Sequence, residues 1–129
     1  MSAPTTRVLQ PATVPASFYP QGLEVTSASR LVFVSGQVGT DDDGHWLDGV
    51  AAQTRQVLAR VSAVLAEAGL GFGDVVKVTI YLTDPADYEP FLAVAGEVLG
   101  APGFTVTGVV VSFLSAPEQK VEVEAIAVG

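Results

Sequence analysis

The sequence contains no cysteine and few basic residues, and each absence excludes a class of function. Among its 129 residues there is no Cys, which rules out disulfides, thiolate metal sites and a cysteine nucleophile. Lysine and arginine total 6 against 14 aspartates and glutamates, a formal net charge of −8. The bases are scattered along the chain, so no basic patch is available to neutralise nucleic-acid phosphates. We therefore expect no nucleic-acid partner.

Long apolar runs are also missing. No apolar stretch approaches the roughly 20 residues that span a bilayer, and the first residues lack the apolar segment of a secretory signal. A chain without cysteine is compatible with a reducing compartment. We expect a cytoplasmic protein with no membrane partner.

The composition is that of a folded domain. Apolar residues make up 49% of the chain, ample for a packed core, and the length suits one domain of about 100–150 residues. Residues 1–129 are therefore predicted to form a single domain. Half of the eight prolines fall within residues 1–20. Because proline disfavours helix and removes a backbone donor, residues 1–18 are predicted to form an extended arm, with at most one short strand near Arg7–Gln10.

The most regular pattern is a stripe of apolar residues between Val50 and Ala68. They recur at spacings of three and four, as on the buried face of a helix. Asp48 precedes this stripe and Gly69 follows it, and these residue types begin and end helices. A helix is predicted between them.

Further elements follow from shorter patterns. Residues 75–82 alternate between apolar and polar side chains, typical of a strand with one buried face. A second helix is predicted between Asp84-Pro85 and Gly100. The other predicted strands are residues 31–35, 45–47, 104–114 and 120–128.

This order of elements indicates an α+β fold with a mixed β-sheet and two helices on one face. The other face would carry apolar residues such as Val109, Val111 and Phe113. A sheet with a bare apolar face predicts self-association.

Three short motifs suggest ligand sites, and each has a simpler interpretation. Gly69–Gly73 is glycine-rich, but it follows a predicted helix and precedes a strand, the reverse of a dinucleotide-binding loop. The run Asp41–Asp43 lacks the ligand spacing of an EF-hand, which favours a solvated turn. His45 is the only histidine, and zinc would need further ligands beside it. We expect no metal and no cofactor.

Glu122 and Glu124 stand on one face of the last predicted strand, among apolar neighbours. Carboxylates are rarely buried without a reason. Two interpretations stay open. Either that face of the strand lies in water, or a carboxylate lines a cleft and acts as a general acid or base.

Six segments of the sequence form a recognisable series, in order and with characteristic spacings: Tyr19–Gly22, Val34–Gln37, Ala51–Leu58, Gly73–Thr79, Leu82–Asp84 and Val121–Ala127. Together they resemble the RidA/YjgF family of small imine and enamine deaminases. The resemblance covers nearly the whole chain from Tyr19 to Ala127, and the series is more specific than any one segment.

The resemblance implies a chorismate-mutase-like single domain that forms a homotrimer with ligand clefts between subunits. Deaminases of this family hydrolyse 2-imino or enamine acids to keto acids and ammonia. An arginine in their penultimate strand holds the substrate carboxylate, and that position falls on Val106 here. Valine cannot form the charge-assisted pair that a carboxylate requires.

Other cleft positions also depart from the family pattern. Gly108 replaces a cysteine or small polar residue, Leu92 an asparagine, and Val34 a threonine. The family's residues are retained at Tyr19, Ser35, Gly36 and Glu122. We hypothesise that Glu122 is the proton-transfer group, that Tyr19 orients the ligand, and that Val34, Leu92 and Val106 form an apolar wall. The implied ligand-binding residues are Val34, Ser35, Gly36, Leu92, Val106 and Gly108.

We therefore predict a diverged RidA-like enzyme that acts on a small, largely uncharged or apolar molecule. Its reaction would be imine or enamine hydrolysis, or an isomerisation or cyclisation in a biosynthetic pathway. Two alternatives stay open. One is a housekeeping 2-imino-acid deaminase with a different carboxylate anchor, for which Arg30 is the candidate. The other is a non-catalytic trimer that binds a small molecule.

Overall fold

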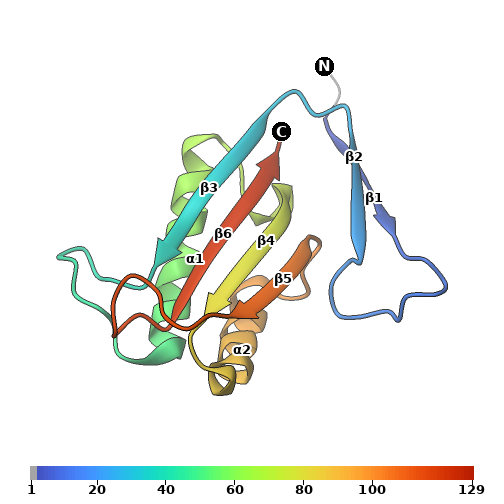
Figure 1. Cartoon of the computed structure of the whole chain (residues 1–129). Coiled ribbons are helices and arrows are strands. Elements are labelled where there is room, and N and C mark those ends of the chain that lie inside the picture. Colours follow the sequence, from blue (N-terminus) through green and yellow to red (C-terminus); the bar gives the residue numbers. More distant parts are fainter. Residues whose placement is uncertain (1–2) are drawn as a thin grey trace.

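The computed structural model describes residues 3–129, and it consists of two sheets and two long helices (Figure 1). A hairpin of β1 (Thr5–Leu9) and β2 (Gly22–Thr26) forms the smaller, two-stranded sheet. The larger sheet has the strand order β3-β6-β4-β5. Its elements are β3 (Leu31–Val38), α1 (Gly49–Glu67), β4 (Val75–Leu82), α2 (Tyr88–Leu99), β5 (Thr105–Val110) and β6 (Val121–Val128), with 3₁₀ turns at Phe72–Asp74 and Pro85–Asp87.

The four-stranded sheet is mixed, and both helices cover the same face of it (Figure 1). β4 and β5 are parallel, whereas β6 pairs antiparallel with both β3 and β4. The predicted α+β architecture is confirmed. No helix in residues 3–129 has the length and apolar character needed to cross a membrane.

The core lies between the sheet and the helices. Residues of β6 alternate, so that Val121, Val123 and Ala125 are buried while Glu122 and Glu124 are only partly buried on the opposite face. No helix in the described residues 3–129 covers that opposite face (Figure 1). On β3, Leu31 is 63% exposed and Phe33 is 69% exposed, so the single chain has a bare apolar face. Val111 and Phe113, which the sequence pattern predicts on that face, lie beyond the end of β5.

Three elements differ from the prediction. β2 was missed, although Leu23 and Val25 alternate with polar neighbours, and it pairs with β1 to make the arm a hairpin. Residues 45–47 contribute only an isolated bridge between Thr40 and Trp46. β5 ends at Val110, because its neighbour β4 ends at Leu82, whose carbonyl accepts a last hydrogen bond from the Val111 amide at 2.8 Å.

The segment between β3 and α1 is fastened to α1 by a buried glutamine. Gln53 is 1% exposed. Its Nε2 donates to the carbonyls of Leu47 at 2.9 Å and Glu118 at 2.8 Å, and its Oε1 accepts from the Lys120 amide at 2.8 Å. Gly39 packs directly on this residue, since a Cβ added to Gly39 would lie 2.6 Å from Gln53 Cα. The loop before β6 and the loop after β3 therefore meet at one side chain.

Candidate functional site

Glu122 is held in a defined position near the start of β6. Gln119 Nε2 donates to Glu122 Oε1 at 3.0 Å. The Ser115 amide donates to Gln119 Oε1 at 2.8 Å, and the Ser115 hydroxyl donates to the same oxygen. On the other side lies Gly36 of β3, where an added Cβ would be 2.7 Å from Glu122 Cδ. Glycine at position 36 is what leaves room for the carboxylate.

Gln119 is a positioning residue that sequence reasoning missed. It is 1% exposed, and its amide joins Glu122 to the turn at Ser115. Buried amides are normally fully hydrogen-bonded, and this one is. Because Gln119 lies in a loop outside any periodic pattern, nothing in the sequence marked it as buried.

Glu124 lies one repeat further along the same face and binds a tyrosine. Tyr81 Oη donates to Glu124 Oε1 at 2.6 Å. This hydrogen bond to a carboxylate raises the pKa of Tyr81 above its usual value, and partial burial and the negative charges of both glutamates add to the shift. Glu124 also lines a shallow basin of about 300 Å³ on the bare face, together with Ser35, Lys77 and Thr79.

The Tyr81 hydroxyl is expected to ionise above the ordinary tyrosine pKa of about 10. Only the protonated phenol can donate to Glu124, so the bond stabilises the fold below that pH and is lost as pH rises through the raised pKa. Glu124→Gln removes the charge and should bring the pKa of Tyr81 back toward the ordinary value. The measurement is the ultraviolet titration of tyrosinate, with Tyr81→Phe subtracted to isolate this phenol. Identical titrations for Glu124→Gln and the parent protein would contradict the assignment.

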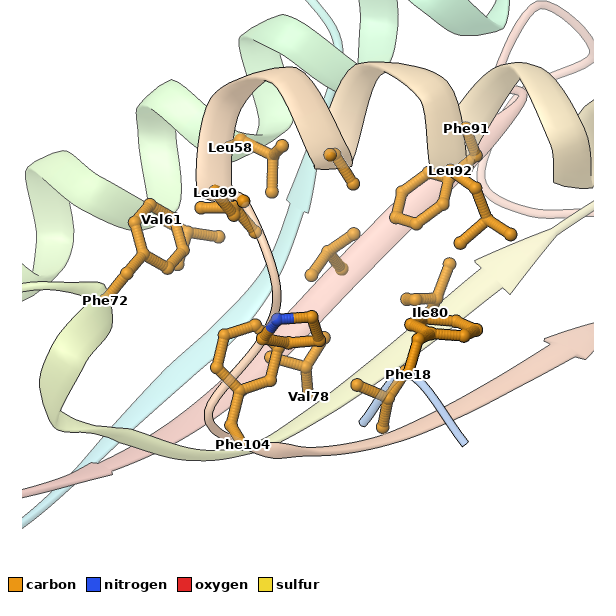
Figure 2. A pocket seen from close by; sticks show the side chains of 16 residues that line it. Phe18, Leu58, Val61, Phe72, Val78, Ile80, Phe91, Leu92, Leu99 and Phe104 are labelled. Carbon is orange, nitrogen blue, oxygen red and sulfur yellow. The ribbon is translucent and has the colours of Figure 1, made fainter. Parts of the chain in front are cut away.

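Leu92, Val106 and Gly108 lie together at the other edge of the sheet. Leu92 of α2 and Val106 of β5 line a cavity of about 240 Å³ between the helices and the sheet (Figure 2). Gly108 faces the same side, since a Cβ added there would lie 3.9 Å from Tyr88 Cε2 of α2. Every residue lining this cavity has an apolar side chain or none.

Tyr19 and Val34 occupy different places from these three residues. Tyr19 is half-buried in the arm, and its ring meets Phe18 edge to face with centroids 4.8 Å apart. Val34 is 3% exposed and belongs to the core beneath the helices, because alternation along β3 directs it inward. Within a single chain, Val34 is a core residue and does not line the cavity that Leu92 and Val106 share.

Within one chain, the remaining residues form two separate groups. Ser35, Gly36 and Glu122 lie on β3 and β6, whereas Leu92, Val106 and Gly108 lie at β5 and α2. β3 and β5 are the two outer strands of the sheet. Adjacent strands are about 4.8 Å apart, so the two edges are separated by about 14 Å. One chain does not bring both groups into one cleft.

Arg30, the alternative carboxylate anchor, is remote from Glu122. Its Nη1 donates to the Ala68 carbonyl at 3.0 Å, and its amide bonds to the carbonyl of Gly129 at 3.0 Å. Glu122 lies near the start of β6 and Gly129 directly after its end, about 24 Å apart at about 3.4 Å per residue. Arg30 therefore links the end of α1 at Ala68 to the end of β6 at Gly129. It is too far from Glu122 of the same chain to hold a substrate carboxylate beside it.

The acidic tip between β3 and α1 has the geometry of a turn. Asp41 Oδ1 accepts from the amides of Asp43 and His45, both at 2.9 Å. The His45 amide is the main cause of a lowered pKa at Asp41. The side-chain atoms of Asp41, Asp43 and His45 that could bind a metal ion lie within 4.8 Å of one another. However, the Asp41 carboxylate already accepts the two hydrogen bonds that close the loop.

Comparison with known proteins agrees with this architecture. The family profile described as Endoribonuclease L-PSP matches residues 10–129. A RutC family protein of Pyrococcus abyssi is 36% identical over 115 residues, covering 88% of this chain and 87% of that protein. The 2-iminobutanoate/2-iminopropanoate deaminase of Homo sapiens is 34% identical over 91 residues, covering 69% of this chain and 66% of the deaminase.

Solved structures show the same relationship over the full length. The crystal structure of a Rid family protein of unknown function from Yersinia pestis matches with a TM-score of 0.78 and 31% identity. The match covers 96% of this chain and 98% of that one. Since profile, sequence and fold agree, the chain belongs to the RidA/YjgF family.

Proposed function

We propose that this protein is a diverged RidA-like enzyme that hydrolyses a small, largely uncharged imine or enamine. The observation that carries the proposal is that Val106 is surrounded by apolar side chains. The family resemblance puts a carboxylate-binding arginine at this position, and here Val106 lines a cavity without a polar side chain. A substrate carboxylate placed there would lose its hydration without gaining a partner, which costs several kcal/mol. An uncharged substrate avoids that cost.

The cleft is proposed to form between subunits of a homotrimer. Two features support this arrangement. The glutamate group and the Leu92–Val106 group lie at opposite edges of one sheet, so a neighbouring copy is needed to bring one group against the other. The bare face with Leu31 and Phe33 also needs a cover, and family members usually form trimers. The lack of cysteine fits our assignment of this trimer to the cytoplasm.

Glu122 is proposed to move the proton. Its carboxylate accepts a proton from a water molecule as the water oxygen bonds to the imine carbon. The same proton then passes to the imine nitrogen, which gives a carbinolamine. Glu122 next transfers the proton of the carbinolamine hydroxyl to the amino group, the carbon–nitrogen bond breaks, and ammonia leaves as the carbonyl forms. Gln119 holds the carboxylate by the 3.0 Å hydrogen bond, so the base is oriented before substrate arrives. Tyr19 is proposed to orient the ligand, and Ser35 and Gly36 to border it.

The test compares a charged and an uncharged imine on the same enzyme. 2-Iminopropionate is generated in place by an amino-acid oxidase, and the imine of phenylacetone by an amine oxidase. Ammonia release is timed against uncatalysed hydrolysis, with protein whose mass in solution equals three chains. We expect acceleration with the neutral imine only. The human deaminase relative is the positive control for 2-iminopropionate.

The opposite pattern would restore the family activity with another anchor. Lys77 is the candidate for that role, because it lines the basin on the bare face with Ser35 and Glu124. In that case Lys77→Met should abolish acceleration with 2-iminopropionate. A folded trimer that accelerates neither imine would contradict imine hydrolysis and favour a binding protein or an isomerase.

Ribonuclease activity, which the profile's description names, has no support in the charge distribution. The net charge is −8. Of the basic side chains, Arg7 pairs with Glu24 at 3.2 Å and Arg55 pairs with Glu97. Phosphate binding depends on clustered, unpaired cations.

A further inference from the structure

We propose that the cavity beneath α2 is a binding site for the aryl or branched alkyl part of an uncharged ligand, with about ten non-hydrogen atoms. The cavity lies between α1, α2 and the strands β4, β5 and β6, within a single chain (Figure 2). It is separate from the glutamate group at β3 and β6. The inference deepens the proposed function, because Leu92 and Val106 belong to both, and it names the substrate class.

The size of the cavity sets the size of the ligand. An engineered protein cavity of about 150 Å³ lined by Leu, Ile and Phe stays dry and holds one benzene ring. The volume here is about 240 Å³. In proportion, it has room for a ring with a side chain of about four carbons, or for a fused pair of rings.

The lining sets the chemistry of the ligand. Aromatic rings surround the cavity on several sides, from Phe72, Phe91 and Phe104 (Figure 2). They offer favourable contacts to another ring. No lining side chain can hydrogen-bond or carry charge, so an ionised group inside would lose hydration without compensation. Selection is therefore for apolar, uncharged groups.

Two small residues of α2 border the cavity, Ala95 half-buried and Gly96 exposed at its rim. Ala95 and Gly96 line the cavity between Leu92 and Leu99. A Cβ added to Gly96 would meet nothing within 4 Å. Larger residues at these two positions would close the cavity, and closing it would also fill a core void, which normally stabilises a fold.

Phe18 of the arm stands at the cavity and forms part of its wall (Figure 2). The residue is 53% exposed, and its ring meets the Tyr19 ring edge to face. Tyr19 is therefore beside the one wall of the cavity that comes from the arm. A ligand whose apolar part fills the cavity would present its polar end toward Tyr19.

The experiment measures binding rather than turnover. Isobutylbenzene, at its solubility limit, is added to the full chain, and the melting temperature and backbone amide NMR shifts are recorded. We expect a higher melting temperature and the largest shifts at amides of the elements that line the cavity, α1, α2, β4, β5 and β6. Sodium benzoate at the same concentration should change neither. An unchanged melting temperature with isobutylbenzene, or an equal response to benzoate, would overturn the proposal.

Matched leucine substitutions on α2 locate the site. Ala95→Leu fills the cavity and should weaken isobutylbenzene binding at least tenfold while raising the melting temperature of the free protein. Ala93→Leu adds the same atoms on the exposed side of the helix and should leave binding unchanged. Gly96→Leu is a second filling variant if Ala95→Leu folds poorly. Equal binding by the filled and control variants would place the ligand elsewhere.

Binding without neutral-imine hydrolysis would refute the proposed reaction alone, and hydrolysis without binding would refute this site alone.

Discussion

Replacing Glu122 with glutamine is expected to slow neutral-imine hydrolysis by about 10²–10⁴-fold, the usual contribution of one placed general acid or base. Glutamine has nearly the same shape, and its carbonyl can still accept from Gln119 Nε2, which bonds Glu122 at 3.0 Å. The fold and the contact with Gly36 should therefore survive, while the capacity to take a proton from water is lost. The loss should appear in kcat, measured as ammonia release under saturating imine.

Glu118→Gln is the matched control for this experiment. Glu118 lies in the loop just before β6 with its residue exposed, so the variant loses the same charge without touching the proposed base. Its rate should match that of the parent protein. An unchanged rate for Glu122→Gln would remove Glu122 from the reaction, and an equal slowing by both variants would indicate a general effect of charge.

Gly39→Ala is expected to destabilise the fold by about 3 kcal/mol, the upper part of the range for overpacking a core. The new Cβ would lie 2.5 Å from Gln53 Cβ and 2.6 Å from Gln53 Cα. The second atom is helix backbone, which cannot rotate aside. Relief would require α1 to move, and that would break the bonds from Gln53 to Leu47, Glu118 and Lys120. Urea unfolding at a fixed chain concentration measures the change.

Two other glycines provide graded controls. Gly73→Ala adds a Cβ that meets nothing within 4 Å and should unfold at nearly the parent urea concentration. Gly36→Ala meets the Glu122 side chain, which can rotate, so we expect little loss of stability and a large loss of activity. Equal unfolding midpoints for Gly39→Ala and Gly73→Ala would show that the contact with Gln53 does not constrain position 39.

Local periodicity predicted most of the fold. β4 occupies residues 75–82 as expected, because its apolar and polar residues alternate without interruption. α1 follows the predicted apolar stripe, with Val57, Val61 and Leu65 fully buried. Gly69 and Gly100, beyond the two helices, adopt φ values of 71° and 68°, the left-handed region that glycine enters readily. These features depend on neighbours in sequence, which a sequence pattern contains.

The candidate site depends on contacts between residues that are distant in sequence, and the sequence pattern predicted fewer of these contacts. That Gly36 faces Glu122 follows from an irregular β3–β6 register, with a shift between Val34 and Gln37. Periodicity alone does not reveal such a shift. Likewise, the burial of Gln53 and Gln119 depends on loops that fold back on the helix and the strand. The match to family positions predicted that Leu92 and Val106 lie close together. The cavity that they line depends on how α2 packs on the sheet, which the sequence pattern does not contain.

The central place of β6 constrains how the chain folds during synthesis. β6 lies between β3 and β4 and pairs with both, yet it is the last strand in the sequence. Leu31 near the beginning pairs with Val128 near the end. Until the ribosome has released residues 121–128, β3 and β4 have no strand between them, and their apolar residues stay exposed to water. Contacts of such long sequence separation slow folding, so the nascent domain remains open to aggregation and to chaperones until residues 121–128 have emerged.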